Sequence, residues 1–537
     1  MADTAKTDIV DGHSRDVAGA TLRGKMLKGF AWETTAKLTI QILSWVSTIV
    51  VARLLDPSDY GLAAIAMLFT QFFDMLVDMG LPQSLIHKVN TTRDEEDGVF
   101  YFSLALGVVL YAVMFMIAPT IASLYGIPEL ADVMRVVGIS AIFVGLKVVP
   151  FAKLSQRMDF RYRSTVEIVA NFWAVITALS LAYMGYGVWT LIVTNLVMHA
   201  VTTLAYLRRL DHVPRPRFNP AKVWNIFEYG LRIFGSNLMY FFYSRAPTFV
   251  AGKFVSTALV GQYNLASSLA SIPMDKIGVI FNRVGLATFA RLKEDHAEVR
   301  RYFLTMHRYL LIISFPVLLG LATVADDVVS ILLTDKWGMA GTLLQILCIG
   351  SMFKVSAMIP QYGLLLGIGR ASLVMRYHLA SLILIPLGAV VGIQFGIVTM
   401  TWALVLAFVP LYLMLMNYAL REIGASFLDL LKSASPAFLG SMAMATVVLL
   451  IKMEMANVGP FLRLGVCATA GAITYVGFVA LVYRGHVNEI RDGLSMLRSK
   501  DPKSKREKRQ DILSQAAGGT QSQSTSDQET RTSQVTT

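Results

Sequence analysis

Five polar residues recur along one apolar stretch near the beginning of the chain, at the spacing of an α-helix. They are Glu33, Lys37, Gln41, Ser44 and Thr48, at intervals of four, four, three and four residues, which places all five on one helical face. Polar side chains are costly in hydrocarbon, so in a membrane helix this face must meet protein or water. Because two of the five are ionisable, we expect the wall of a hydrated central cavity. The alternative is a polar seam between packed helices.

Three further apolar stretches carry polar stripes of the same kind. The stretch 60–86 has Gln71, Asp74 and Asp78; the stretch 224–252 has Arg232, Ser236, Tyr240 and Tyr243, with Arg245 before Pro247; the stretch 257–281 has Asn264, Ser268, Ser271 and Asp275, with Lys276 beside them. Ser and Thr alone could serve only to hold helices together, but the ionisable residues make that explanation less sufficient. Four polar faces are therefore available to surround one cavity.

The composition sets the class of protein that must position these faces. Of 537 residues, 55% are hydrophobic and only 16% are charged, whereas a soluble globular chain carries about 25% charged residues. The apolar runs predict an all-α integral membrane protein with about fourteen spans. They lie near 30–55, 60–86, 99–124, 133–152, 165–184, 187–207, 224–252, 257–281, 303–325, 340–367, 374–395, 397–420, 434–451 and 462–483.

The distribution of basic residues orients these spans. With an intracellular N-terminus, the six inner loops hold 22 Lys and Arg, whereas the seven outer loops hold five. Cytoplasmic loops of membrane proteins are enriched in Lys and Arg, so both termini are expected in the cytoplasm. The same loops explain the net charge of +12 without a nucleic-acid partner.

Motifs typical of enzymes are missing from the places where a site could form. There is no HExxH, CxxC, GxSxG or P-loop pattern there, and the two cysteines, Cys348 and Cys467, both lie in apolar runs. We therefore expect no enzymatic activity, no metal site and no disulfide framework. The segment 498–537 is basic and then rich in Gln, Ser and Thr, and is expected to be a disordered cytoplasmic tail, its basic part near anionic lipid headgroups.

An internal repeat relates the two halves of the chain. Arg53 precedes Gly61 by eight residues and Lys253 precedes Gly261 by eight residues, so both pairs are offset by 200 positions. Six spans separate the copies, which gives them the same orientation, as in transporters with parallel repeats. In such transporters the substrate site lies where the repeats meet, which is where the polar stripes would be brought together.

Several short strings, in order, resemble the polysaccharide flippases of the MOP exporter superfamily, relatives of the MATE drug exporters. They are Ala52–Pro57 with Tyr60-Gly61, Leu154–Phe160, Gly185–Trp189, Gly261–Ala266, Phe315-Pro316 through Asp335-Lys336-Trp337, and Leu364–Arg370. The resemblance covers roughly residues 25–420 and is greatest to the branch serving exopolysaccharides such as succinoglycan or colanic acid. It implies two pseudo-symmetric six-helix lobes around a central cavity, plus two C-terminal helices. The expected parts are a tail at 1–28, an N-lobe at 29–210, a C-lobe at 222–420, two added helices at 433–484 and the tail at 498–537.

The resemblance also implies the cargo, a polyprenyl-diphosphate-linked oligosaccharide moved across a bacterial inner membrane. Arg and Lys bind phosphate, so the cavity cations are candidate substrate ligands: Lys37, Arg232, Arg245, Lys276 and Lys354. Inward carboxylates can bind H⁺ or Na⁺, which makes Glu33, Asp74 and Asp78 candidates for ion coupling; no other cofactor is expected. Gln41, Ser44, Gln71, Asn264 and Ser268 are expected to line the cavity. Membrane lipids and the polysaccharide polymerase and export machinery are the candidate partners.

Each cation also has a simpler explanation. Lys37 can pair with Glu33 at i,i+4, and Arg245 can bind carbonyls freed by Pro247. Arg53 and Lys253 lie near span ends, from which their charges can reach the membrane interface.

Two other functions remain open. A MATE-like cation-coupled drug exporter would share the fold but needs a cavity dominated by acids, because its cargo is cationic. A membrane glycosyltransferase, polymerase or ligase would need a large outer loop or domain, and all the outer loops look short.

Overall fold

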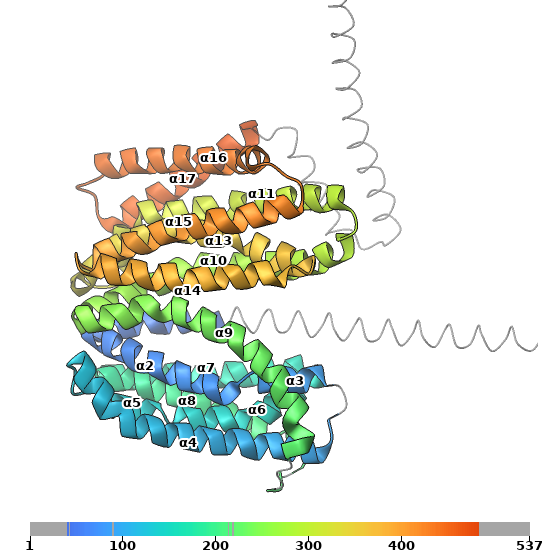
Figure 1. Ribbon diagram of the computed structural model, residues 1–537. Helices are drawn as coiled ribbons and strands as arrows, with labels where there is room; N and C mark the ends of the chain where they lie inside the picture. Colours follow the sequence, from blue (N-terminus) through green and yellow to red (C-terminus); the bar gives the residue numbers. More distant parts are fainter. Residues whose placement is uncertain (1–39, 42, 89–90, 213, 217–219, 483–537) are drawn as a thin grey trace, which may run out of the picture. The chain divides into compact units, whose positions relative to one another are not determined.

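The computed structural model describes residues 40–41, 43–88, 91–212, 214–216 and 220–482. Within this part of the chain every regular element is helical (Figure 1), which confirms the all-α prediction. The chain divides into two units, Met1–Gly471 and Ala472–Thr537. The second contributes only the end of the last helix to the described residues.

We call residues 40–207 the first half and residues 220–454 the second half. The first half contains a helix at Leu43–Leu54, followed by α2 (Pro57–Asp78), α3 (Leu81–His87), α4 (Arg93–Tyr125), α5 (Leu130–Val137), α6 (Ser140–Gln156), α7 (Phe160–Tyr183) and α8 (Val188–Leu207). The second half contains α9 (Pro220–Phe254), α10 (Thr257–Leu292), α11 (His296–Thr323), α12 (Ala325–Leu332), a 3₁₀ turn at Asp335–Trp337, α13 (Gly338–Met358), a π-helical segment at Ile359–Leu365, α14 (Ala371–Ile393), α15 (Ile397–Glu422) and α16 (Phe427–Glu454). The last helix is α17 (Pro460–Val482).

Eleven helical segments among the described residues are long and apolar enough to cross a membrane, which supports a multi-pass membrane protein. The expected count of fourteen is not established. The described helix at Leu43–Leu54 is short, and much of the first expected span lies outside the described residues. Helices α9 and α10 are long but carry many polar and charged side chains. The first helix, α9 and α10 are three of the four stretches in which the sequence predicted polar stripes.

Polar residues fix where several helices begin. The Thr92 hydroxyl accepts a hydrogen bond from the Glu95 amide at 3.4 Å, and the Glu95 carboxylate accepts one from the Thr92 amide at 3.1 Å. Ser426 and Asp429 make the same reciprocal pair at the start of α16, at 3.2 and 2.9 Å. Such pairs satisfy amides that have no partner within the helix. They explain why α4 and α16 begin several residues before their apolar runs.

Three expected spans are interrupted, and one of them, 133–152, is divided into α5 and α6 at Gly138 and Ile139. Met79 and Gly80 adopt positive φ angles of 41° and 71° between α2 and α3, and a Cβ on Gly80 would lie 2.7 Å from the Gly230 carbonyl oxygen of α9. Glycine therefore suits both the turn and the close approach. The expected span 340–367 ends as an α-helix at Met358 and continues as a π-helical segment.

The two halves meet most closely where α2 contacts α10. A Cβ on Gly61 would lie 1.7 Å from the Thr257 carbonyl oxygen, and a Cβ on Gly261 would lie 1.9 Å from the Pro57 carbonyl oxygen. Helix α9 joins the halves a second time, because it packs against α14 and also against α3 and α4 (Figure 1). The apolar core accordingly runs through both halves and includes Ile65, Met134 and Trp337.

Candidate functional site

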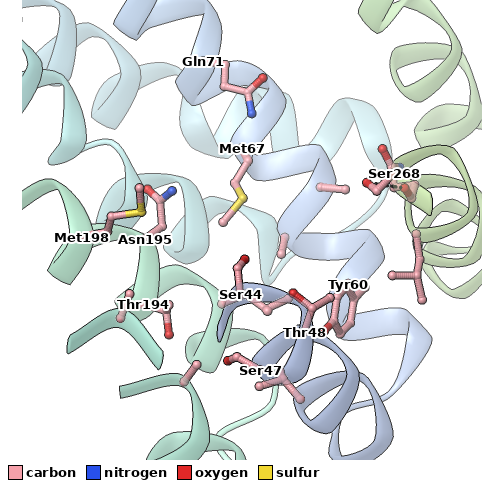
Figure 2. A pocket seen from close by; sticks show the side chains of 18 of the residues that line it. Ser44, Ser47, Thr48, Tyr60, Met67, Gln71, Thr194, Asn195, Met198 and Ser268 are labelled. Carbon is pink, nitrogen blue, oxygen red and sulfur yellow. Dashed lines mark hydrogen bonds between the residues drawn. The ribbon is translucent and has the colours of Figure 1, made fainter. Parts of the chain in front are cut away.

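A cavity of about 600 Å³ lies among the first helix, α2, α7, α8, α9 and α10. We call it the central cavity. Its polar lining consists of Ser44, Ser47, Thr48, Tyr60, Gln71, Asn171, Thr194, Asn195, Arg245, Thr248, Asn264 and Ser268. Figure 2 shows Ser44, Gln71, Asn195 and Ser268 arranged around this space on four different helices. The helices that the repeat pairs, α2 with α10 and the first helix with α9, all contribute to its wall.

Five of the predicted site residues line the central cavity together. They are Ser44, Gln71, Arg245, Asn264 and Ser268. Gln41 lies on the same stripe as Ser44 and accepts a hydrogen bond from the Lys276 ammonium of α10 at 2.5 Å. The structure therefore places Gln41 of the first helix against Lys276 of α10, and neither is among the residues that line the central cavity.

The lining of the central cavity is polar but nearly free of titratable groups. Among its described residues the only charged side chain is Arg245, and none is a carboxylate. The Asn171 Oδ1 and Thr194 Oγ1 atoms are buried without a hydrogen-bond partner among the described residues. Buried polar atoms normally have a partner, so these two are exceptions among the described residues.

Sequence reasoning missed the contribution of α7 and α8. Asn171, Thr194 and Asn195 interrupt the apolar runs of the fifth and sixth expected spans, which was the available signal. They form no long stripe, however, and their spans are not among those that the repeat relates. Thr248 was missed as well; its hydroxyl donates to Asn264 Oδ1 at 3.2 Å.

The acidic residues of α2 do not line the central cavity. Asp74 accepts hydrogen bonds from the Ser140 hydroxyl of α6, at 3.0 and 3.2 Å. Asp78 lines a second cavity of about 430 Å³ with Lys147, Glu167 and His199, which lie on α6, α7 and α8. The expectation that the whole stripe faces one cavity was therefore wrong for α2. The three residues lie within about 60° around the axis of α2, but Asp78 lies about 10 Å beyond Gln71 along that axis, so the two ends of the stripe meet different neighbours.

Besides Lys276, two predicted cations lie outside the lining of the central cavity. Lys354 lines a third cavity of about 200 Å³ in the second half, which we call the Lys354 cavity. Arg232 lies outside all three cavities and pairs with Glu228 one turn earlier at 2.7 Å, with 76% of its side chain exposed. Glu33 and Lys37 lie outside the described residues.

Contacts between the two halves gather beside the starts of α2 and α10, and we call them the latch. From the first half, the Arg53 guanidinium donates to the carbonyls of Ile331 and Leu332, at 2.9 Å to the latter. From the second half, the Lys253 ammonium donates to the Leu124 carbonyl. The two residues that mark the repeat thus each bind the end of a helix in the opposite half.

Aromatic side chains complete the latch. The Trp337 indole N–H donates to the Ala52 carbonyl at 2.9 Å, and its ring packs edge-on against Tyr60 with centroids 5.2 Å apart. Lys336 pairs with Asp56 at 3.1 Å. On the other side the Tyr125 hydroxyl donates to the Phe249 carbonyl at 3.2 Å.

In the described part of the chain no three His, Cys, Asp or Glu side chains gather in a way that could hold a metal ion.

Comparison with known proteins gives matches along most of the chain. A family described as "Polysaccharide biosynthesis protein" matches residues 50–341, which is more than half of the sequence. The teichuronic acid biosynthesis protein TuaB of Bacillus subtilis (strain 168) is 24% identical over 86% of this chain and 96% of its own. The succinoglycan biosynthesis transport protein ExoT of Rhizobium meliloti (strain 1021) is 23% identical over 89% of this chain and 96% of its own.

Among solved structures, the lipid II flippase MurJ in an inward closed conformation has the same fold. The TM-score is 0.71 at 15% identity, over 85% of this chain and 99% of MurJ. The family match agrees with the resemblance predicted from the short strings in the sequence. The chain belongs to the polysaccharide biosynthesis protein family.

Proposed function

We propose that this protein is an alternating-access flippase. It moves a polyprenyl-diphosphate-linked oligosaccharide from the cytoplasmic to the periplasmic leaflet of a bacterial inner membrane, for exopolysaccharide synthesis. The single observation that carries the proposal is the polar central cavity between two related halves of a membrane protein. The names of TuaB, ExoT and MurJ, which refer to teichuronic acid biosynthesis, succinoglycan biosynthesis transport and a lipid II flippase, support the same proposal.

The chemistry of the central cavity fits an anionic, hydroxyl-rich cargo. Arg245 offers a guanidinium that can bind two oxygens of a diphosphate at once. Lys276, beside Gln41, supplies a second positive charge. Lys37 and Arg232 remain candidate ligands of the diphosphate along the path of the cargo. The amides and hydroxyls of Asn171, Thr194 and Asn195 can bind sugar hydroxyls. At about 600 Å³ the cavity has the size of a site for a small molecule or for the first sugars of a longer one.

In this proposal the latch closes one end of the path between the two halves. Arg53, Lys253 and Lys336 are among the few basic residues assigned to the outer loops by the charge distribution, so the latch would lie at the periplasmic end, with both termini in the cytoplasm. Alternating access requires the halves to separate at one end while they close at the other. Releasing the cargo outward would therefore require the latch to open.

Ion coupling is assigned to a different place from cargo binding. Asp74 and Asp78 lie on the α6 side of α2, and Lys147, Glu167 and His199 line the same cavity as Asp78. Binding of H⁺ or Na⁺ there would act on the packing of α2 without touching the cargo. Glu33 stays a candidate for the same role. We propose no other cofactor and no enzymatic reaction.

The charge of the central cavity fits the alternative, a cation-coupled drug exporter, less well than it fits the flippase. A cationic drug needs carboxylates to replace its hydration, and the described lining of the central cavity has an arginine and no carboxylate. Sensitivity of a deletion strain to cationic drugs, with polysaccharide export unchanged, would support the alternative.

Charge reversal at Arg245 tests the proposal. Arg245→Glu should abolish polysaccharide export and cause the lipid-linked precursor to accumulate, because the diphosphate would meet a negative charge. Arg245→Lys should retain part of the export. Arg301→Glu is a matched control, since Arg301 is an exposed arginine paired within α11 to Glu298 at 2.9 Å. Normal export by Arg245→Glu, at wild-type protein level, would remove Arg245 from the cargo site; normal export by the deletion strain would refute the flippase itself.

A further inference from the structure

The Lys354 cavity is separate from the central cavity. It is enclosed by α9, α10, α13, α14 and α15, and the two cavities share no lining residue. They lie on different faces of α9 and α10: Arg245, Thr248 and Asn264 face the central cavity, whereas Ser244 and Tyr263 face the Lys354 cavity. Lys354 therefore requires an explanation of its own.

Lys354 has no counter-charge in the described part of the protein. Its ammonium lies 4.6 Å from the centre of the Phe408 ring. Among the described residues it has neither an ion-pair partner nor a hydrogen-bond partner, and neither Asp nor Glu lines its cavity. A cation inside a membrane protein normally has a counter-charge, and one aromatic ring replaces only part of its hydration.

Hydroxyl groups accompany this cation. Tyr240, Tyr263 and Ser267 line the cavity, and within the described structure none of their hydroxyls has a hydrogen-bond partner. Ser244 and Tyr243, by contrast, are engaged: Ser244 donates to the Phe241 carbonyl at 3.1 Å, and the Tyr243 hydroxyl lies 3.2 Å from His378 Nδ1. One ammonium and three available O–H donors form a set that complements an anion.

We propose that the Lys354 cavity binds a single monovalent anionic group, either a free halide or the carboxylate of an acidic sugar. The cavity of about 200 Å³ is too small for a lipid diphosphate with its oligosaccharide, so this site is distinct from the proposed cargo site. Because its walls come from five helices of the second half, an anion bound there would hold α9 and α10 against α13 and α15.

Chloride binding to the purified full-length protein tests the proposal. Excess broadening of the ³⁵Cl NMR line, and a rise in the thermal midpoint with sodium chloride relative to a bulky sulfonate buffer of equal ionic strength, are expected. Lys354→Met should lose both signals, whereas Lys354→Arg should retain them. Lys432→Met is the matched control and should behave as wild type, since Lys432 is an exposed lysine of α16 that does not line this cavity.

Sodium glucuronate separates the two sources of the anion. If it raises the thermal midpoint of the wild type but not of Lys354→Met, while chloride has no effect, the site binds a sugar carboxylate. If chloride acts and glucuronate does not displace it, the site binds a free halide. Neither anion acting on the wild type, or both acting equally on Lys354→Met, would overturn the proposal.

A second variant keeps the test decisive if Lys354→Met fails to fold. Tyr263→Phe combined with Ser267→Ala removes two donors while leaving the charge, and should weaken the binding of whichever anion acts by about tenfold or more. Unchanged affinity in this double variant would also contradict the proposed site. These outcomes are independent of polysaccharide export, so they do not depend on the proposed flippase activity.

Discussion

The starts of α2 and α10 are two copies of one arrangement, and each binds the opposite half of the chain. Arg53 and Lys253 occupy the same place in the repeat, and so do Gly61 and Gly261. In each copy a basic side chain donates to carbonyls at the end of a distant helix. In each copy an aromatic side chain of the opposite half, Trp337 or Tyr125, donates to a backbone carbonyl just before the helix break.

The two copies differ in the number and burial of their contacts with the opposite half. Beside α2, Arg53 donates to two carbonyls, Lys336 adds an ion pair, and the Trp337 ring is completely buried. Beside α10, Lys253 donates to one carbonyl, and the smaller ring of Tyr125 is only half-buried. The comparison indicates that the contact beside α2 contributes most of the stability of the latch and that the contact beside α10 opens more easily.

Removing the two aromatic rings should give the largest difference between the copies. Trp337→Ala deletes a buried ring and its hydrogen bond, and should lower the stability by about 3–5 kcal/mol. Tyr125→Ala should cost less, because its ring is partly exposed. The thermal midpoint of the purified protein measures both. Trp402→Ala is the control, since Trp402 is 42% exposed; if Trp337→Ala were no worse than this control, the latch would not depend on the indole.

Adding a methyl group at the glycine contact should affect the two copies equally. Gly61→Ala and Gly261→Ala each place a Cβ within 2 Å of a backbone oxygen of the other helix. The helices must then move apart, at a cost of about 1–3 kcal/mol.

Gly465→Ala on α17 is the matched control, because nothing lies within 4 Å of its added Cβ. The thermal midpoints of the three purified variants measure the loss of stability. Two wild-type-like results at Gly61 and Gly261 would show that α2 and α10 are not in contact in the protein's main conformation.

Neutralising the two basic residues should give the smallest losses of stability. The two losses should show directly which copy contributes more to the stability of the latch. Arg53→Met should lower the stability by about 1 kcal/mol, and Lys253→Met by less, because hydrogen bonds from exposed charges are partly replaced by water. The thermal midpoints of the two purified variants measure this order. The reverse order would contradict the asymmetry between the copies.

The short strings that identified the family are explained by this contact. Ala52, Arg53 and Asp56 come from one string, and Lys336 and Trp337 come from another almost 300 residues later. The structure pairs them directly. Gly261, from a third string, packs against Pro57. The sequence could show the strings and their order, but nothing local to any one of them indicates that they touch.

The sequence by itself determined the helical class, the apolar runs, the repeat of Arg53 and Gly61, and the polar stripes that carry Ser44, Gln71 and Asn264. These features follow from hydropathy and helical period, which depend only on neighbouring residues. Tertiary structure alone decided that Asp74 faces α6, that Asn195 joins the central cavity and that Lys354 has a cavity of its own. A periodic pattern shows which residues share a face of a helix, but the helices packed around it decide what that face meets.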